Sequence, residues 1–186
     1  MNQHKESLDN QLGKEFLEKT LKQFKNYKSW AEKAISQVTS DENLNKQIDN
    51  ESNSIAIIIK HLEGNMQSRW TDVYTTDGEK ESRKRPTEFD RTFNPTRKEL
   101  MDLWEHGWKI LFDTFDTFTP DKLLTTIYIR KEPHTIMDAI LRQVAHYANH
   151  VGQIMFLAKH LEYDHWKHVT LPRDAEVFDT KEISKN

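Results

Sequence analysis

Two histidines four residues apart, His146 and His150, offer the most evident chemistry in the chain. They lie in the segment HYANHVGQI, whose spacing is that of an α-helix, and a helix places side chains four apart on one face about 5–6 Å from each other. Two imidazoles at that separation can share one metal ion through nitrogens at roughly 2.0–2.1 Å. Because the chain has 9 histidines, such a pair also arises by chance, and packing beside a core is the alternative.

A metal site needs at least a third protein ligand. The chain has no cysteine, so this ligand must be His, Asp or Glu. His61 is the candidate, because it lies on the flank of its own apolar stripe, as His146 and His150 do on theirs. Asn65, Tyr147 and Gln153 are candidates to orient the imidazoles, since a ligand imidazole needs a partner for its other nitrogen; ordinary packing is the competing interpretation for each.

Other known catalytic and metal-binding motifs are absent from the sequence. Tyr147, not Glu, follows His146, so the H-E-x-x-H pattern of zincin peptidases is absent. The chain also lacks a Gly-rich phosphate loop, a Gly-x-Ser-x-Gly elbow and the paired Glu-x-x-His motifs of di-iron bundles. His106 lies near the polar face of its helix, which favours a surface or packing role. The remaining histidines do not share the placement of His61, His146 and His150.

Helices must position these residues, because only 5 Gly and 5 Pro occur and the intervals between them carry helical spacing. Apolar stripes predict four helices, over residues of about 10–39, 51–70, 94–115 and 135–161. Asn94 is the predicted N-cap of the third helix, with Pro95 at its first position, and Thr135 caps the fourth. His61 belongs to the second helix and the histidine pair to the fourth.

Two connections and a tail complete the chain. The stretch from Thr71 to Phe93 has mixed charges without periodicity and predicts a surface loop, in which the basic run SRKR is interpreted as solvated. Residues 119–135 alternate and are rich in β-branched residues, which predicts a short extended segment or half-hairpin. The tail from Glu162 is expected to wrap the bundle or fray. The prediction is an all-α four-helix bundle, a single domain over 1–186 with a core of about 10–172.

Composition limits the classes of function. A formal net charge of -3 provides no broad positive field, so we expect no nucleic-acid partner. The longest apolar run, IAIII, is far too short to span a bilayer, and the first residues lack a cleavage pattern, so we expect a cytoplasmic protein without a membrane partner. The lack of cysteine excludes disulfides and thiolate nucleophiles from the chain itself.

Two long segments, NSIAIIIKHLEGNMQSRW and RQVAHYANHVGQIMFLAKHL, together resemble the DinB/YfiT-like superfamily of metal-binding four-helix bundles. The resemblance is specific to a branch known only as a domain of unknown function. It extends from about residue 10 to 172 and includes EPHT before the last helix and LPR in the tail. In that family one histidine comes from the second helix and two, spaced by four and followed by Val-Gly-Gln or similar, come from the last. These positions are His61, His146 and His150 here.

The resemblance implies that the three histidines bind a divalent ion such as zinc or nickel, with water completing the coordination. Members of the superfamily include thiol S-transferases, a maleylpyruvate isomerase and metal-dependent hydrolases, and many dimerise. It therefore implies a metal-dependent enzyme, with a low-molecular-weight thiol as candidate substrate and a homodimer as candidate assembly. The thiol-binding residues of the relatives do not map onto this sequence. A non-catalytic, metal-stabilised dimeric module or small-molecule binder is the alternative.

Overall fold

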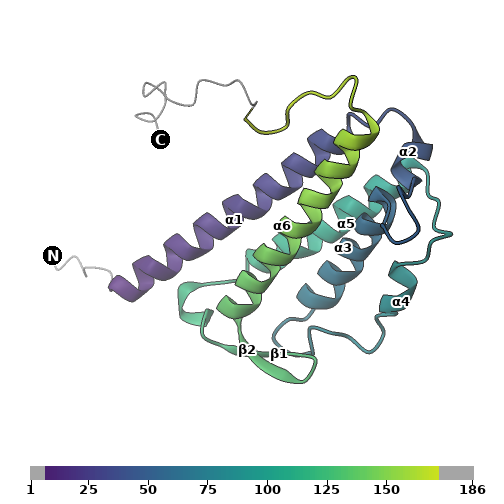
Figure 1. Cartoon of the computed structure of the whole chain (residues 1–186). Coiled ribbons are helices and arrows are strands. Elements are labelled where there is room, and N and C mark those ends of the chain that lie inside the picture. Colours follow the sequence, from purple (N-terminus) through teal and green to yellow (C-terminus); the bar gives the residue numbers. More distant parts are fainter. Residues whose placement is uncertain (1–6, 172–186) are drawn as a thin grey trace, which may run out of the picture.

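The structure, a computed structural model, describes residues 7–171, so the last part of the predicted tail lies outside the described residues. The described chain is mostly helical, with one two-stranded sheet (Figure 1). Its elements in order are α1 (Leu8–Ile35), α2 (Asp41–Asn45), α3 (Ile55–Trp70), α4 (Arg85–Glu88), α5 (Arg97–Phe115), η1 (Pro120–Lys122), β1 (Thr126–Ile129), β2 (Glu132–Thr135) and α6 (Ile136–Leu161). The prediction of a mostly helical fold is confirmed.

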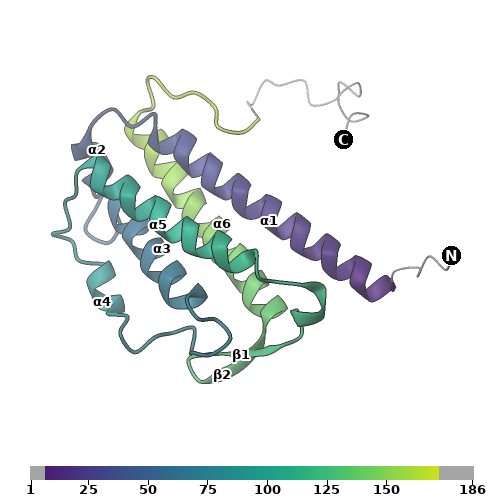
Figure 2. The ribbon, with the colours of Figure 1, turned by 180° about the vertical axis from the view of Figure 1, so that it is seen from behind.

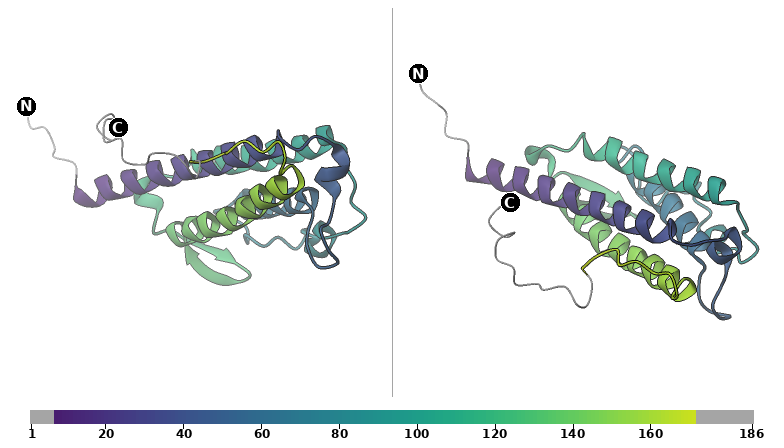
Figure 3. Two further views of the ribbon diagram at one scale, coloured as in Figure 1. Left: turned by 45° about the horizontal axis from the view of Figure 1, so that its top comes forward. Right: turned by 90° about the horizontal axis from the view of Figure 1, so that it is seen from above.

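The four long helices α1, α3, α5 and α6 lie side by side and enclose the core (Figures 2 and 3). The most extensive helix contacts are those of α3 with α5 and of α1 with α6, and α3 also packs against α6. Large aromatic side chains fill the space between them: Phe24 of α1 and Tyr147 of α6 have ring centroids 5.7 Å apart, and Trp108 of α5 lies 5.8 Å from Tyr147. Helix α6 is thereby fixed against the core on the side next to its histidines.

Helix α3 carries apolar residues on more than one face because it packs against several neighbours. Ser54 caps it by accepting a hydrogen bond from the backbone N–H of Ile57 at 3.2 Å. Ile55, Ile57 and Ile58 are all buried, although residues so closely spaced point in different directions around a helix. Helix α5 covers one side of α3, while α6, α2 and α4 contact others. His61, in the middle of this helix, is therefore held in a rigid surrounding.

Two helix boundaries differ from the prediction. The first helix ends at Ile35 instead of continuing to about residue 39, because Ser40 starts a new short helix, α2, by accepting the N–H of Asn43. The third helix is capped by Thr96 and not by Asn94. Thr96 forms a capping box with Glu99, in which each side chain accepts the other residue's backbone N–H. A reciprocal pair outweighs the single cap that Asn94 offers.

The two connections are more ordered than predicted. Within residues 119–135, η1 is followed by a complete antiparallel hairpin over residues 126–135, with Thr126 opposite Thr135. Its turn residues Arg130 and Lys131 have φ of 55° and 65°, as a two-residue hairpin requires. The carboxylate of Asp77 accepts both of their backbone N–H groups. The loop between α3 and α5 is thus hydrogen-bonded to the hairpin turn, and it contains helix α4 where none was predicted.

Within residues 7–171 no helix is both long and apolar enough to cross a membrane.

Candidate metal centre

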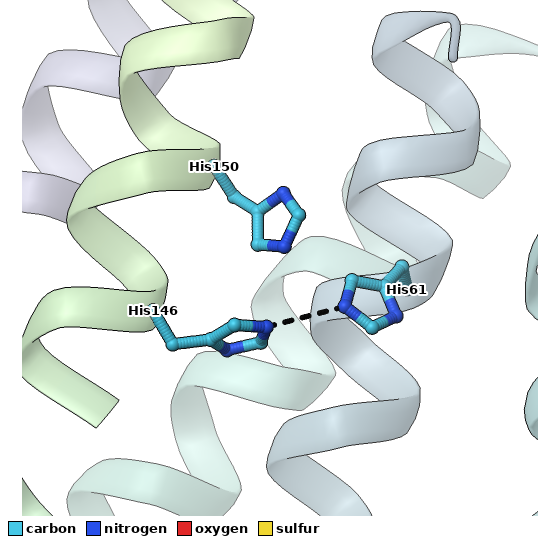
Figure 4. Close-up of side chains that lie close together, drawn as sticks. All are labelled: His61, His146 and His150. Carbon is cyan, nitrogen blue, oxygen red and sulfur yellow. Dashed lines mark hydrogen bonds between the residues drawn. The ribbon is translucent and has the colours of Figure 1, made fainter. Parts of the chain in front are cut away.

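The structure brings His61, His146 and His150 together between α3 and α6. Figure 4 shows the two imidazoles of α6, one turn apart, pointing toward the imidazole of α3. The ring centroids are 5.3 Å apart for His61 and His146, 4.9 Å for His61 and His150, and 4.7 Å for His146 and His150. Within residues 7–171 these residues are a group of histidines whose candidate ligand nitrogens all lie within 4.8 Å of one another. Three histidines so close together can hold a metal ion.

The distance between two of the nitrogens fits a common ion. The Nε2 atoms of His61 and His146 are 3.3 Å apart. Ligand atoms bound tetrahedrally at 2.0–2.1 Å from zinc lie about 3.3–3.4 Å from each other. The two nitrogens are therefore already separated as neighbouring ligands would be, and His150 adds a third donor from one turn further along α6.

Burial keeps the α6 histidines neutral at physiological pH. Burial, and secondly the proximity of His150 and His61, lowers the pKa of His146 to about 3. Burial also lowers the pKa of His150, and His61 adds to the effect. A neutral imidazole has a lone pair available to a metal ion, whereas imidazolium has none. Protons therefore do not compete with an ion for His146 at neutral pH.

His61 is oriented by Glu88, a residue that the sequence analysis did not identify. Its Nδ1 lies 2.8 Å from Oε2 of Glu88, and the two side chains are only 5% and 7% exposed. Burial opposes ionisation of Glu88, but the hydrogen bonds from His61 and Arg83 more than offset it and lower the pKa of the carboxyl. Phe89, the next residue, packs on the His61 ring with centroids 4.8 Å apart. The segment around α4 thus contacts His61 through both a charge and an aromatic ring.

The other two histidines differ in their partners. Gln153, a candidate partner of an imidazole, has its Oε1 3.1 Å from Nδ1 of His150. Nδ1 of His146 is buried and has no hydrogen-bond partner among residues 7–171. In the form of His61 that carries its single proton on Nδ1, beside Glu88, Nε2 of His146 is the donor in the contact between the two Nε2 atoms. A metal ion on Nε2 would place the ring proton of His146 on Nδ1, for which the described residues offer no acceptor.

Asn65 and Tyr147, the other two candidates to orient an imidazole, have hydrogen bonds to other groups. The hydroxyl of Tyr147 donates to Oδ1 of Asn65 at 3.2 Å and accepts the indole N–H of Trp70 at 3.0 Å. All three side chains are buried. Burial raises the pKa of the Tyr147 hydroxyl, so the hydroxyl stays a donor. These residues form a hydrogen-bonded chain within the core, and the ring of Tyr147 lies 5.5 Å from that of His146 between centroids.

Two further expectations are settled by contacts elsewhere. His106 is half-exposed and contacts Glu63 on α3 at 2.8 Å, which agrees with a surface role. The basic run SRKR was interpreted as solvated, and this is wrong for Arg83. The Arg83 side chain is only 5% exposed, because it pairs with Glu88 and Glu79. A charge run without periodicity gave no sign that one of its members points inward.

A pocket of about 620 Å³ lies between α6 and the segment before α3, and none of the three histidines lines it. Its walls include apolar side chains from Ile48, Ile58 and Phe156, and polar ones from Asn149 and Gln153. Gln153 also contacts His150. The pocket therefore reaches the residue that supports one of the three imidazoles.

Fold and site together define a mostly helical protein in which histidines from two packed helices form a cluster able to hold a metal ion. The chain belongs to the family described as protein of unknown function (DUF1572), whose model matches residues 11–175. The matched range contains the three histidines and Glu88. No curated protein and no solved structure matches the chain.

Proposed function

We propose that this protein binds one divalent metal ion through His61, His146 and His150, in a four-helix bundle of the DinB/YfiT type. One observation carries the proposal: the Nε2 atoms of His61 and His146, from two different helices, converge to 3.3 Å beside the His150 ring. Packing alone does not require two imidazoles to face each other with their nitrogens. Their separation is the one that neighbouring ligands of a tetrahedral ion have.

The donor set fits zinc or nickel, because imidazole nitrogens suit both ions and no thiolate is present. Three protein ligands leave at least one coordination position for water or a substrate atom. Such an ion, when bound, lowers the pKa of a bound water or thiol and so supplies a nucleophile at neutral pH. The chain itself contributes neutral ligands and fixed ring orientations, through Glu88 for His61 and Gln153 for His150.

The reaction class that best fits these features is a metal-dependent transfer to or from a low-molecular-weight thiol, with hydrolysis as the second candidate. The pocket lined by Gln153, which contacts His150, has room for a small substrate and offers both apolar and polar contacts. The proposal includes a cytoplasmic homodimer and no nucleic-acid or membrane partner. The alternative is a non-catalytic module, either a helical dimer stabilised by its metal or a small-molecule binder.

Metal analysis tests the binding proposal. Protein purified without an affinity tag should carry one divalent ion per chain, and His150→Ala should lose it. His106→Ala is the matched control, because that imidazole is half-exposed and contacts Glu63 outside the cluster. If the wild type binds no stoichiometric ion when supplied with zinc or nickel, or His150→Ala keeps the ion as firmly as His106→Ala does, the proposal is wrong.

A turnover screen separates the enzyme from the module. Metal-loaded protein is incubated with bacillithiol-like or glutathione-like thiols and a panel of electrophiles, and thiol consumption is followed. Turnover that disappears in His150→Ala supports the transferase. The non-catalytic alternative is supported if the protein carries stoichiometric metal but turns over neither the thiol panel nor ester or amide substrates.

A further inference from the structure

Gly64 creates a slot that the side chain of Glu88 occupies. It lies on α3 three residues after His61, and a Cβ atom added there would meet Oε1 of Glu88 at 2.5 Å and its Cδ at 3.0 Å. The backbone does not demand glycine, since no described glycine has a positive φ. Glycine inside a helix costs about 1 kcal/mol relative to alanine. The close approach of Glu88 to the helix gives a physical reason for this residue.

Arg83 fixes the carboxylate inside that slot. Its Nε donates to Oε1 of Glu88 at 2.7 Å and its Nη2 to Oε2 at 2.8 Å, so that the guanidinium binds both oxygens. A third nitrogen, Nη1, donates to Glu79 at 3.1 Å. A forked pair of this kind fixes direction as well as distance. Glu88 therefore has little freedom to turn away from His61.

The fixed carboxylate determines which nitrogen of His61 faces α6. An ionised carboxylate only accepts hydrogen bonds, so the 2.8 Å contact requires a proton on Nδ1 of His61. In the neutral ring Nε2 then carries the lone pair, and it is Nε2 that faces His146. Glu88 contacts the ring from the side opposite to the α6 histidines, which is where a partner that orients a metal ligand must lie.

We propose that Glu88, admitted by Gly64 and held by Arg83, is the positioning residue that sets the tautomer and the ring orientation of His61 for metal binding. This inference rests on the proposed function. It makes the α3–α5 connection, which carries both Arg83 and Glu88, part of the metal centre. A purely structural role for the Arg83–Glu88 ion pair predicts instead that its loss lowers stability and leaves the affinity for metal unchanged.

Glycine substitutions separate these two roles. Gly64→Ala places a methyl group where Oε1 of Glu88 lies. Gly107→Ala is the matched control, because Gly107 also lies in a helix interior. A Cβ there would be 3.1 Å from Cα of Glu63 and from Sδ of Met66, so the new methyl group contacts α3 at a place where Glu88 does not lie. Zinc affinity is measured by competition with a chromophoric chelator, and stability by urea unfolding of metal-free protein. We expect Gly64→Ala to lower zinc affinity by about 10–100-fold, and Gly107→Ala to change stability only.

Glu88→Gln provides a second, nearly isosteric test in case Gly64→Ala does not fold. It removes the charge that selects the Nδ1–H form of His61, so zinc affinity should fall by about tenfold or more. Nitrogen chemical shifts of the metal-free protein supply an independent readout. His61 should be in the Nδ1–H form in the wild type and in a mixture of tautomers in Glu88→Gln, whereas a purely structural role predicts no change.

The outcomes distinguish the two proposals. A wild type that binds no zinc overturns the proposed function. A second result overturns only the role of Glu88. In it the wild type binds zinc, Glu88→Gln and every folded glycine variant keep the wild-type zinc affinity, and His61 keeps its tautomer in Glu88→Gln. A similar loss of affinity in Gly64→Ala and Gly107→Ala also overturns it, because general crowding of α3 would then explain the effect.

Discussion

Substitution of Tyr147 by Phe tests the assignment of this residue to the core and not to the metal site. The change removes only the hydroxyl that joins Trp70 to Asn65. Both partners would lose a hydrogen bond, and they are 1% and 5% exposed, so water cannot readily replace it. Each buried polar group left without a partner costs about 1–3 kcal/mol. For the two groups together, with some relaxation of Asn65, we expect a loss of about 2–4 kcal/mol in the free energy of unfolding.

The assay is urea unfolding of metal-free protein, with zinc affinity measured in parallel. Tyr27→Phe is the control, since it removes a hydroxyl from another core ring that does not belong to this hydrogen-bonded chain. A partner of a metal-binding imidazole would change zinc affinity by about 10–100-fold, whereas we expect Tyr147→Phe to leave it at the wild-type value. A stability loss below about 0.5 kcal/mol, the range of ordinary surface substitutions, or a tenfold loss of zinc affinity would refute the reasoning.

Three further predictions concern the elements around the site. Thr96→Ala should lower the free energy of unfolding by about 0.5–2 kcal/mol and Asn94→Ala should not; equal effects in urea unfolding would contradict the assignment of the cap. Burial opposes ionisation of Glu162, but hydrogen bonds from Thr39 and Asn43 more than offset this effect and lower the pKa of Glu162 below its usual 4.5. The wild type should therefore have a higher free energy of unfolding than Glu162→Gln at pH 7, and this difference should disappear as the pH falls through the lowered pKa of Glu162. A difference that grows on acidification, measured by urea unfolding, would contradict this prediction. Asp77→Ala should speed amide hydrogen exchange at the two hairpin turn residues, while unchanged exchange would mean that the turn holds without the carboxylate.

Apolar periodicity predicted α1, α5 and α6 because each has a main buried stripe, and it also predicted α3, which buries apolar residues on more than one face. Leu100, Trp104 and Trp108 are all buried in α5, as their spacing indicates. Boundaries were less accurate, since a cap depends on which of several nearby polar side chains finds a reciprocal partner. Thr96 and Asn94 are both acceptable caps by type, and only the position of Glu99 three residues after Thr96 favours the former. That capping-box spacing was visible in the sequence.

The three histidines were accessible to sequence reasoning because each lies on the flank of a helical stripe. Glu88 was not, because it lies 27 residues from His61 in a connection without periodicity. Two signals pointed toward it. Pro86 in RPTEF suits the first turn of a short helix, and Gly64 inside an otherwise regular helix indicates close approach of another group. Neither signal names the approaching residue, which depends on how the connection folds back on α3.

The distance in sequence between the two sides of the candidate metal centre has a consequence for folding kinetics. His146 and His150 are neighbours as soon as α6 forms, but His61 is 85 residues away from His146. Contacts that close so long a loop form late, after the entropy of the intervening chain has been lost. An ion bound between α3 and α6 therefore stabilises the native state more than the folding transition state. Metal should slow the unfolding of this protein and leave its folding rate nearly unchanged.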